Sequence, residues 1–251
     1  MTILVVSGTG TGVGKTVVTA AIAALAMAAG RRVAVVKPVQ TGAAPTEPAD
    51  LAEVDRLAAP TTLLELARYP DPLAPAAAAR LAGLPFVDLT RFADRIQLLT
   101  ADHELVLVEG AGGLLVPFDA SGGTLADLAR ALAAPVVLVA DPALGTLNHT
   151  ALTLEALSAR GLECAGVVLG SWPADPDLAC RANLADLEAL LGRPLAGALA
   201  WGIGRLGRPD FADAARAGLA PSFGGRFDAA DFRRTHDPRP RGPQPDQAEQ
   251  D

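Results

Sequence analysis

The sequence predicts an α/β fold with a doubly wound, mainly parallel sheet and helices on both of its faces. Short, continuous aliphatic runs recur along the chain, as in strands that are buried on both faces of a parallel sheet. Ala- and Leu-rich stretches of helical length alternate with these runs. A glycine-rich segment joins the first aliphatic run to the first helical stretch, in the order strand, loop, helix.

The elements follow in a regular order. Strands are expected at residues 3–6, 32–38, 104–110, 135–141 and 164–170. Helices are expected at residues 17–29, 50–58, 87–100, 124–133, 148–160 and 177–191. Ligands of such sheets bind beyond the carboxyl ends of the strands, so the residues just after each strand are the candidates for a functional site.

The first of these candidates is the glycine-rich segment SGTGTGVGKTVV. Glycine tolerates positive φ and lets backbone N–H groups point inward, and the helix that follows presents its free N–H groups and positive dipole end. Such a loop suits phosphate, with Lys15 at the β and γ phosphates and the Thr16 hydroxyl on Mg²⁺. Five residues separate Gly8 from Gly14 where the usual pattern has four, so the loop is one residue longer than the standard P-loop of nucleoside triphosphatases.

Composition limits the partners. At 251 residues, half of them hydrophobic, the chain can bury a full core, and one domain is expected over residues 1–232. The net charge of −7 argues against nucleic acid or an anionic membrane as a partner. No basic N-terminal leader and no apolar run of ~18 residues is found, so a cytoplasmic protein is expected. Residues 233–251 are rich in proline and charge, which predicts a disordered tail.

A second candidate group would bind metal. Glu109 ends an apolar strand, where a buried carboxylate is costly unless a cation pairs with it. Thr16, Glu109 and Asp50 could supply oxygen ligands to Mg²⁺, with nucleotide phosphates and water completing the octahedron. Asp50 also stands at the start of a predicted helix, where an N-cap is the alternative role.

Other strand ends leave two interpretations open. Lys37 is either a second ammonium near the phosphates or a surface lysine, and the proline after it is expected to stop further strand pairing. The glycines of residues 110–113 either let a small substrate approach the backbone or form a tight turn without a ligand. At residues 145–150, Thr146 and Asn148 could cap a helix, or the free N–H groups there could bind a carboxylate.

The motifs together resemble the dethiobiotin synthetase family. The matching segments, in order over about residues 1–200, are GTGTGVGKT, KPVQTG, DLAEVDRLA, VEGAGGLLVP and LGTLNHT. The resemblance implies a homodimeric ligase that uses ATP and Mg²⁺ to close the ureido ring of dethiobiotin from 7,8-diaminononanoate and CO₂. It also implies a carbamate that attacks the γ-phosphate and a carbamic–phosphoric anhydride that the second amine closes.

The resemblance further implies a role for each matching position. Lys15 and Lys37 would neutralise carbamate and γ-phosphate, with Thr11 beside the reacting groups. The metal ligands would be Thr16, Asp50 and Glu109. Nucleotide would be bound by Gly12, Val13, Gly14, Lys15, Thr16, Val17, Gly170 and Ala200. The diamine would be bound by Thr41, Ala111 and Gly112, and by Gly145, Thr146, Leu147 and Asn148 of the opposite subunit.

The chain departs from the family at the nucleotide. Gly10 and Gly12 stand where acidic residues are frequent, Gly170 stands where an asparagine that contacts adenine is frequent, and Ala200 replaces a frequent proline. We therefore expect weak discrimination between ATP and other nucleoside triphosphates.

Three other functions compete with this one. A partition-type P-loop ATPase acting as a nucleotide switch would carry a second lysine early in the loop, and no lysine precedes Lys15. Cobyrinate synthases resemble this ATP domain but need a glutaminase domain for which the chain is too short. A non-catalytic nucleotide binder would release no phosphate in response to the diamine.

Overall fold

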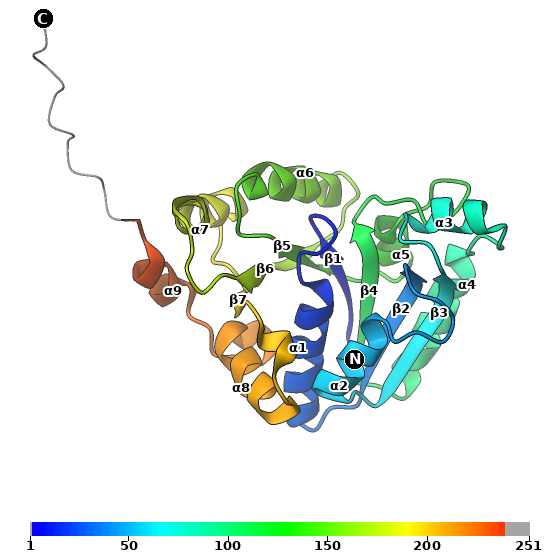
Figure 1. Ribbon diagram of the computed structural model, residues 1–251, viewed down its shortest axis with the longest axis horizontal. Coiled ribbons are helices and arrows are strands. Elements are labelled where there is room, and N and C mark those ends of the chain that lie inside the picture. Colours follow the sequence, from blue (N-terminus) through cyan, green and yellow to red (C-terminus); the bar gives the residue numbers. More distant parts are fainter. Residues whose placement is uncertain (1, 239–251) are drawn as a thin grey trace, which may run out of the picture.

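Helices cover both faces of a parallel sheet in the computed structural model, which describes residues 2–238 (Figure 1). The strands are β1 (Thr2–Gly8), β2 (Val33–Thr41), β3 (Thr62–Tyr69), β4 (Leu105–Gly113), β5 (Val136–Ala140), β6 (Cys164–Trp172) and β7 (Gly197–Ala200). Their order in the sheet is β3-β2-β4-β1-β5-β6-β7, and each pair of neighbours is parallel. The predicted fold class is confirmed.

The helices lie between the strands in sequence. They are α1 (Lys15–Ala28), α2 (Asp50–Ala58), α3 (Pro75–Ala82), α4 (Leu89–Leu98), α5 (Leu125–Ala131), α6 (Thr146–Ser158), α7 (Leu178–Leu191), α8 (Arg208–Gly218) and α9 (Ala229–His236). Short 3₁₀ turns are η1 (Leu99–Ala101), η2 (Ile203–Arg205) and η3 (Pro221–Phe223). In the described part of the chain, none of these helices has the length and apolar character needed to cross a bilayer.

The core lies on both sides of the sheet because successive strand residues point to opposite faces. Val6 packs in the cluster formed with α1, α2 and α8, whereas Val5 packs in the cluster formed with α3, α4 and α5. A third cluster joins β5 and β6 to α7. The chain therefore winds outward through β2 and β3, returns to β4 beside β1, and continues to β7 at the other edge, so that the loop after β1 lies where the direction of winding changes.

Several elements were not predicted. β3 is an edge strand that pairs only with β2, and its sequence TLLELARY consists largely of residues that favour helices. Pairing with β2 decides its structure, and Arg68 and Glu65 form an ion pair at 2.7 Å along its length. α3, β7, α8 and α9 were also missed.

Two predicted boundaries are corrected by the structure. Pro38 does not stop pairing, because β2 continues beyond it and pairs with β3 as far as Thr41, although the pairing with β4 ends at Val36. Residues 233–236 belong to α9, which Asp228 caps and which packs its Phe232 ring 5.1 Å from the ring of Trp172. Residues 237 and 238 follow this helix, and the remainder of the predicted tail, residues 239–251, lies outside the described residues.

Candidate active site

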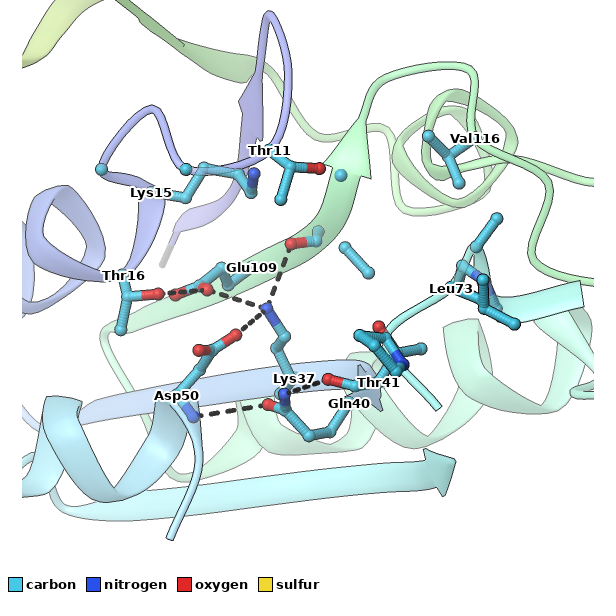
Figure 2. Close-up of a pocket in the computed structure, with 18 of the residues that line it drawn as sticks. Thr11, Lys15, Thr16, Lys37, Gln40, Thr41, Asp50, Leu73, Glu109 and Val116 are labelled. Atoms are coloured by element: carbon cyan, nitrogen blue, oxygen red, sulfur yellow. Dashed lines mark hydrogen bonds and ion pairs between the residues drawn. The ribbon is translucent and has the colours of Figure 1, made fainter. Parts of the chain in front are cut away.

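A cavity of about 680 Å³ opens where β1, β2 and β4 end, and Figure 2 shows the side chains that line it. Several predicted site residues lie on its wall: Thr11, Gly12, Gly14, Lys15, Thr16, Val17, Lys37, Thr41, Asp50, Glu109, Ala111 and Gly112. The first and last of these residues, Thr11 and Gly112, are about 100 positions apart in the sequence. The crossover connections of the sheet bring them together. The strand-end rule therefore located this cavity correctly.

The glycine loop has the backbone that phosphate binding requires. Gly12 and Gly14 have φ values of 78° and 95°, which other residues rarely adopt, and Gly14 is the N-cap of α1. The ammonium of Lys15 donates to the carbonyl of Gly10 at 2.9 Å and so lies folded over its own loop. Burial lowers the pKa of Lys15, and the positive charge of Lys37 lowers it further.

Lys37 is at the centre of the charged residues in Figure 2. Its Nζ lies 2.5 Å from Asp50 Oδ2 and 2.8 Å from Glu109 Oε1, and it donates to the carbonyl of Gly110 at 3.2 Å. The side chain is only 3% exposed, which excludes the surface-lysine interpretation. Burial lowers the pKa of Lys37, but Glu109 and Asp50 outweigh it and hold the pKa above its usual value. Lys37 is therefore a permanent cation of this cavity.

Glu109 has one oxygen paired and one free. Oε1 accepts hydrogen bonds from Lys37 and from the hydroxyl of Thr16, at 2.8 and 2.9 Å. Oε2 is buried without a hydrogen-bond partner, which is costly unless a further donor or a cation approaches it.

The oxygen atoms present here fit Mg²⁺. The free Oε2 of Glu109, the carboxylate of Asp50 and the hydroxyl of Thr16 are hard oxygen donors close to the phosphate-binding loop. Residues 2–238 contain no group of three His, Cys, Asp or Glu side chains placed to hold a metal by themselves.

Asp50 does not cap its helix. It is the first residue of α2, the N-cap is Ala49, and the Asp50 carboxylate faces Lys37 instead. Its backbone N–H donates to the side-chain oxygen of Gln40 at 3.4 Å. Gln40 is a buried wall residue that was not singled out, although it lies within the KPVQTG segment.

The glycines in the last residues of β4 serve two purposes. A Cβ on Gly110 would lie 2.3 Å from Leu125 Cδ2, so this position is small because α5 packs against it. Gly112 has a φ of 70° and lies beside Thr11, on the wall of the cavity. Gly110 is therefore explained by packing, which neither interpretation foresaw, whereas the approach of a substrate to Gly112 stays a prediction.

Residues 145–148 lie apart from this cavity. Gly145, with a φ of 97°, is the N-cap of α6, and neither Thr146 nor Asn148 makes a capping hydrogen bond, so the expectation of a side-chain cap is wrong. None of these four residues lines the cavity. The adjacent Leu144 is 88% exposed.

A smaller cavity of about 310 Å³ lies on the other side of the glycine loop. Its wall contains the predicted residues Gly12, Gly14, Val17, Gly170 and Ala200, together with Glu53 and Trp201, which were not predicted. The Arg205 guanidinium lies 4.7 Å from the ring centre of Trp201.

Gly170 is also a packing position. A Cβ there would lie 2.0 Å from the carbonyl oxygen of Val13 and 2.6 Å from a methyl group of Val139. The backbone of β6 therefore supports the glycine loop directly, and no larger residue fits at this position without moving the loop. The sequence marked this position by a glycine at the end of a strand. It gave no sign that Gly170 contacts the glycine loop at Val13.

The fold is shared with solved P-loop proteins. The cell division protein MinD in the MinC:MinD complex of Aquifex aeolicus has a TM-score of 0.54 and 14% identity, with 86% of each chain covered. The cell division ATPase MinD of Pyrococcus furiosus has a TM-score of 0.51 and 21% identity, covering 85% of this chain and 89% of its own. At such identities the likeness shows the fold alone. The fold and the loop define a P-loop nucleotide-binding protein of the α/β class.

Sequence comparison narrows the class. Residues 2–203 match the family model of an AAA domain. The ATP-dependent dethiobiotin synthetase BioD of Frankia casuarinae is 63% identical over 93% of this chain and 98% of its own. The enzyme of the same name from Saccharopolyspora erythraea is 62% identical over 90% of this chain and 99% of its own. The chain belongs to the family of ATP-dependent dethiobiotin synthetases, which confirms the resemblance and the expectation of an enzyme.

Proposed function

We propose that the chain carboxylates 7,8-diaminononanoate with CO₂ and closes the ureido ring, forming dethiobiotin, ADP and phosphate. The observation that carries this proposal is the charged group of buried Lys37 and Glu109 with half-buried Asp50, on the wall shared with Lys15 and Thr16. Two ammonium groups beside a phosphate-binding loop suit a reaction between two anions, a carbamate and a terminal phosphate.

The first step makes the anion that reacts. One amine of the substrate attacks CO₂, loses a proton and becomes a carbamate. Thr41, Ala111 and Gly112 line the cavity, and their small size leaves room for the diamine close to the loop. Lys37 already donates its three protons to Asp50, Glu109 and Gly110, so the carbamate must take over one of these contacts. Asp50 is the most solvent-exposed of the three and is the contact most readily exchanged.

The second step transfers the phosphoryl group. A carbamate oxygen attacks the γ-phosphorus, ADP leaves, and a carbamic–phosphoric anhydride forms. Lys15 and the loop N–H groups would hold the phosphates, and Lys37 would hold the carbamate in line with them. Thr16, Asp50 and Glu109 would hold Mg²⁺, which supplies neutralisation of the charge on the phosphate oxygens when it is bound.

The last step closes the ring. The second amine attacks the carbonyl carbon of the anhydride, phosphate leaves with the former carbamate oxygen, and a proton is released. Thr11 belongs to the glycine loop and turns its Oγ1 toward Gly112, so it can donate a hydrogen bond to the departing phosphate.

We also propose that the site is completed by a second copy of the chain. The free N–H groups at the start of α6 suit the substrate carboxylate, but residues 145–148 do not line the cavity of their own chain. The exposed Leu144, Leu115 and Leu152 offer apolar surface for a homodimer. The consumption of ATP agrees with the predicted cytoplasmic location.

The smaller cavity is proposed to hold the nucleoside. Gly12, Gly14, Gly170 and Ala200 on its wall offer backbone atoms to the base. None of these four residues has a polar side chain that could discriminate between bases. We therefore expect ATP, CTP and GTP to be used with specificity constants within about tenfold of one another. A competition assay that shows a much stronger preference for ATP would contradict this expectation.

Phosphate release tests the overall function. The purified protein is incubated with Mg²⁺ and ATP, with the diamine, with bicarbonate, or with all of them. Release that requires diamine and bicarbonate together supports the ligase. Release that is independent of the diamine favours the nucleotide-switch alternative, and nucleotide binding without any release favours the non-catalytic binder.

A further inference from the structure

Helix α2 touches both cavities. Its first residue, Asp50, pairs with Lys37 on the wall of the larger cavity. One turn later, Glu53 lies on the wall of the smaller cavity. Figure 1 shows α2 beside α1, close to the chain that leads into α8. Residues of this one helix are therefore placed to affect both the phosphate end and the nucleoside end of a bound nucleotide.

Arg56 joins α2 to the outer wall of the smaller cavity. Its Nη1 donates to the carbonyl of Leu206 at 3.0 Å, and its Nη2 donates to the carbonyl of Gly204. Both carbonyls belong to the segment 201–206, which contains η2 and supplies Trp201 and Arg205 to the wall. Arg56 thus holds two successive parts of this segment with one planar group.

Glu53 fixes the direction of Arg56. Its two carboxylate oxygens accept from Nη2 and Nε of Arg56, at 2.5 and 2.9 Å. This two-point contact orients the guanidinium plane toward the carbonyls, which a lysine ammonium could not reproduce. Glu53 also lies close to Gly204, since a Cβ on Gly204 would be 3.7 Å from its Oε1.

Within the described residues, the segment makes few other hydrogen bonds to its surroundings. Its internal bonds are turn bonds, from Arg205 N–H to Gly202 and from Leu206 N–H to Ile203. Trp201 N–H donates to the carbonyl of Trp172 at 2.7 Å at one end, and Arg208 donates to the carbonyl of Asp55 at the other. Gly202, with a φ of 84°, allows the turn between these ends. The middle of the wall is therefore held from inside by Ile203, which is buried in the core, and from outside by Arg56.

We propose that Arg56 is a positioning residue that sets the affinity for the nucleoside part of the substrate by holding segment 201–206 against α2. This inference rests on the proposed function, because it assumes that the nucleoside occupies the smaller cavity. Arg56 touches neither the glycine loop nor the larger cavity, so the phosphate groups should bind independently of it.

The test compares two ligands that share a triphosphate. Binding of Mg-ATP and of inorganic tripolyphosphate with Mg²⁺ is measured by calorimetry for the wild type, Arg56→Ala and Arg56→Lys. Arg130→Ala is the matched control, because Arg130 forms the same type of i,i+3 ion pair with Asp127 on α5 and neither residue lines the larger or the smaller cavity. Thermal unfolding is measured for each variant.

We expect Arg56→Ala to weaken ATP binding by about tenfold while tripolyphosphate binding is unchanged. The KM for ATP should rise by the same factor with little change in kcat, Arg56→Lys should be intermediate, and Arg130→Ala should match the wild type. Equal weakening of both ligands, or no change in either, would overturn the inference. Failure of the proposed function would appear already in the wild type, as turnover that does not require the diamine, so the two failures are distinguishable.

Discussion

The Nζ atom of Lys37 lies 2.8 Å from Oε1 of Glu109, and the two side chains are 3% and 0% exposed. A second acid, Asp50, lies 2.5 Å from the same ammonium. Removing one member of a buried ion pair leaves an uncompensated charge, which is more costly than the absence of the whole pair. The same ion pairs are therefore expected to contribute both to the stability of the fold and to catalysis.

Lys37→Ala should affect both properties. We expect turnover to fall by at least about 10²–10³-fold, because a preorganised charge donor is lost. The protein should remain folded at 25 °C, but the free energy of unfolding should fall by about 3–5 kcal/mol, because Glu109 is left without its cation. Stopped assays of phosphate release and urea unfolding monitored by circular dichroism measure the two effects.

The double variant Lys37→Ala/Glu109→Gln separates the effect on turnover from the effect on stability. Without either charge, stability should recover toward that of the wild type, while turnover stays low. Near-wild-type turnover in Lys37→Ala would remove Lys37 from the mechanism, and a double variant less stable than the single one would contradict the assigned cost of the unpaired carboxylate.

Gly170→Ala tests the contact between β6 and the glycine loop. The added methyl group would overlap the carbonyl of Val13 and a methyl of Val139, so the loop must shift. We expect about 1–3 kcal/mol of destabilisation and a raised KM for ATP. Gly207→Ala is the control, because a Cβ there meets open space. A Gly170→Ala enzyme with unchanged stability and KM would show that the loop does not depend on this contact.

Mixed dimers test whether each site spans two subunits. Asn148→Asp places a negative charge at the start of α6, where the substrate carboxylate is proposed to bind, and should raise the KM for the diamine. Mixing this variant with Lys37→Ala gives heterodimers with one intact and one doubly impaired site. At low diamine concentration, an equal mixture should recover about a quarter of the wild-type activity. If both groups came from one chain, mixing would recover none.

Acid stability should depend on Glu104. This carboxylate accepts hydrogen bonds from the side chain and the backbone N–H of Arg32, and these bonds lower the pKa of Glu104 to about 2 from 4.5. Because the folded-state pKa is lowered, the stabilisation is complete above the unfolded value and is lost as the pH falls through about 2.

Urea unfolding of the wild type and Glu104→Gln at several pH values measures this effect. The wild type should be the more stable protein near neutral pH, and its advantage should shrink below pH 4.5. A difference between the two proteins that stays constant down to pH 2 would contradict the assignment.

The sequence was sufficient to predict five of the sheet's seven strands and the larger cavity, because these follow from local signals. Buried parallel strands are continuous aliphatic runs. Lys37 and Glu109 each stand where such a run ends, and Lys15 follows the glycine loop after the first run. The edge strand β3 was missed because its half-buried residues carry no such signal and its pairing with β2 is not local.

The smaller cavity was predicted only in part for a related reason. Gly170 and Ala200 were identified through family resemblance, whereas Glu53, Arg56 and Trp201 depend on how α2 meets the segment before α8. Contacts between residues about 150 positions apart leave no periodic pattern in a single sequence. The burial of Lys37 was likewise undecided until Asp50 and Glu109 were seen on either side of it.

The fate of one oxygen atom tests the proposed chemistry most directly. The enzyme is given ATP, Mg²⁺, the diamine and CO₂ labelled with oxygen-18, and the reaction is stopped before the label exchanges with water. If a carbamate oxygen attacks the γ-phosphate beside Lys37, the released phosphate carries one labelled oxygen and the ureido carbonyl carries the other. Unlabelled phosphate, formed together with dethiobiotin, would contradict the anhydride and the assignment of Lys37 to it.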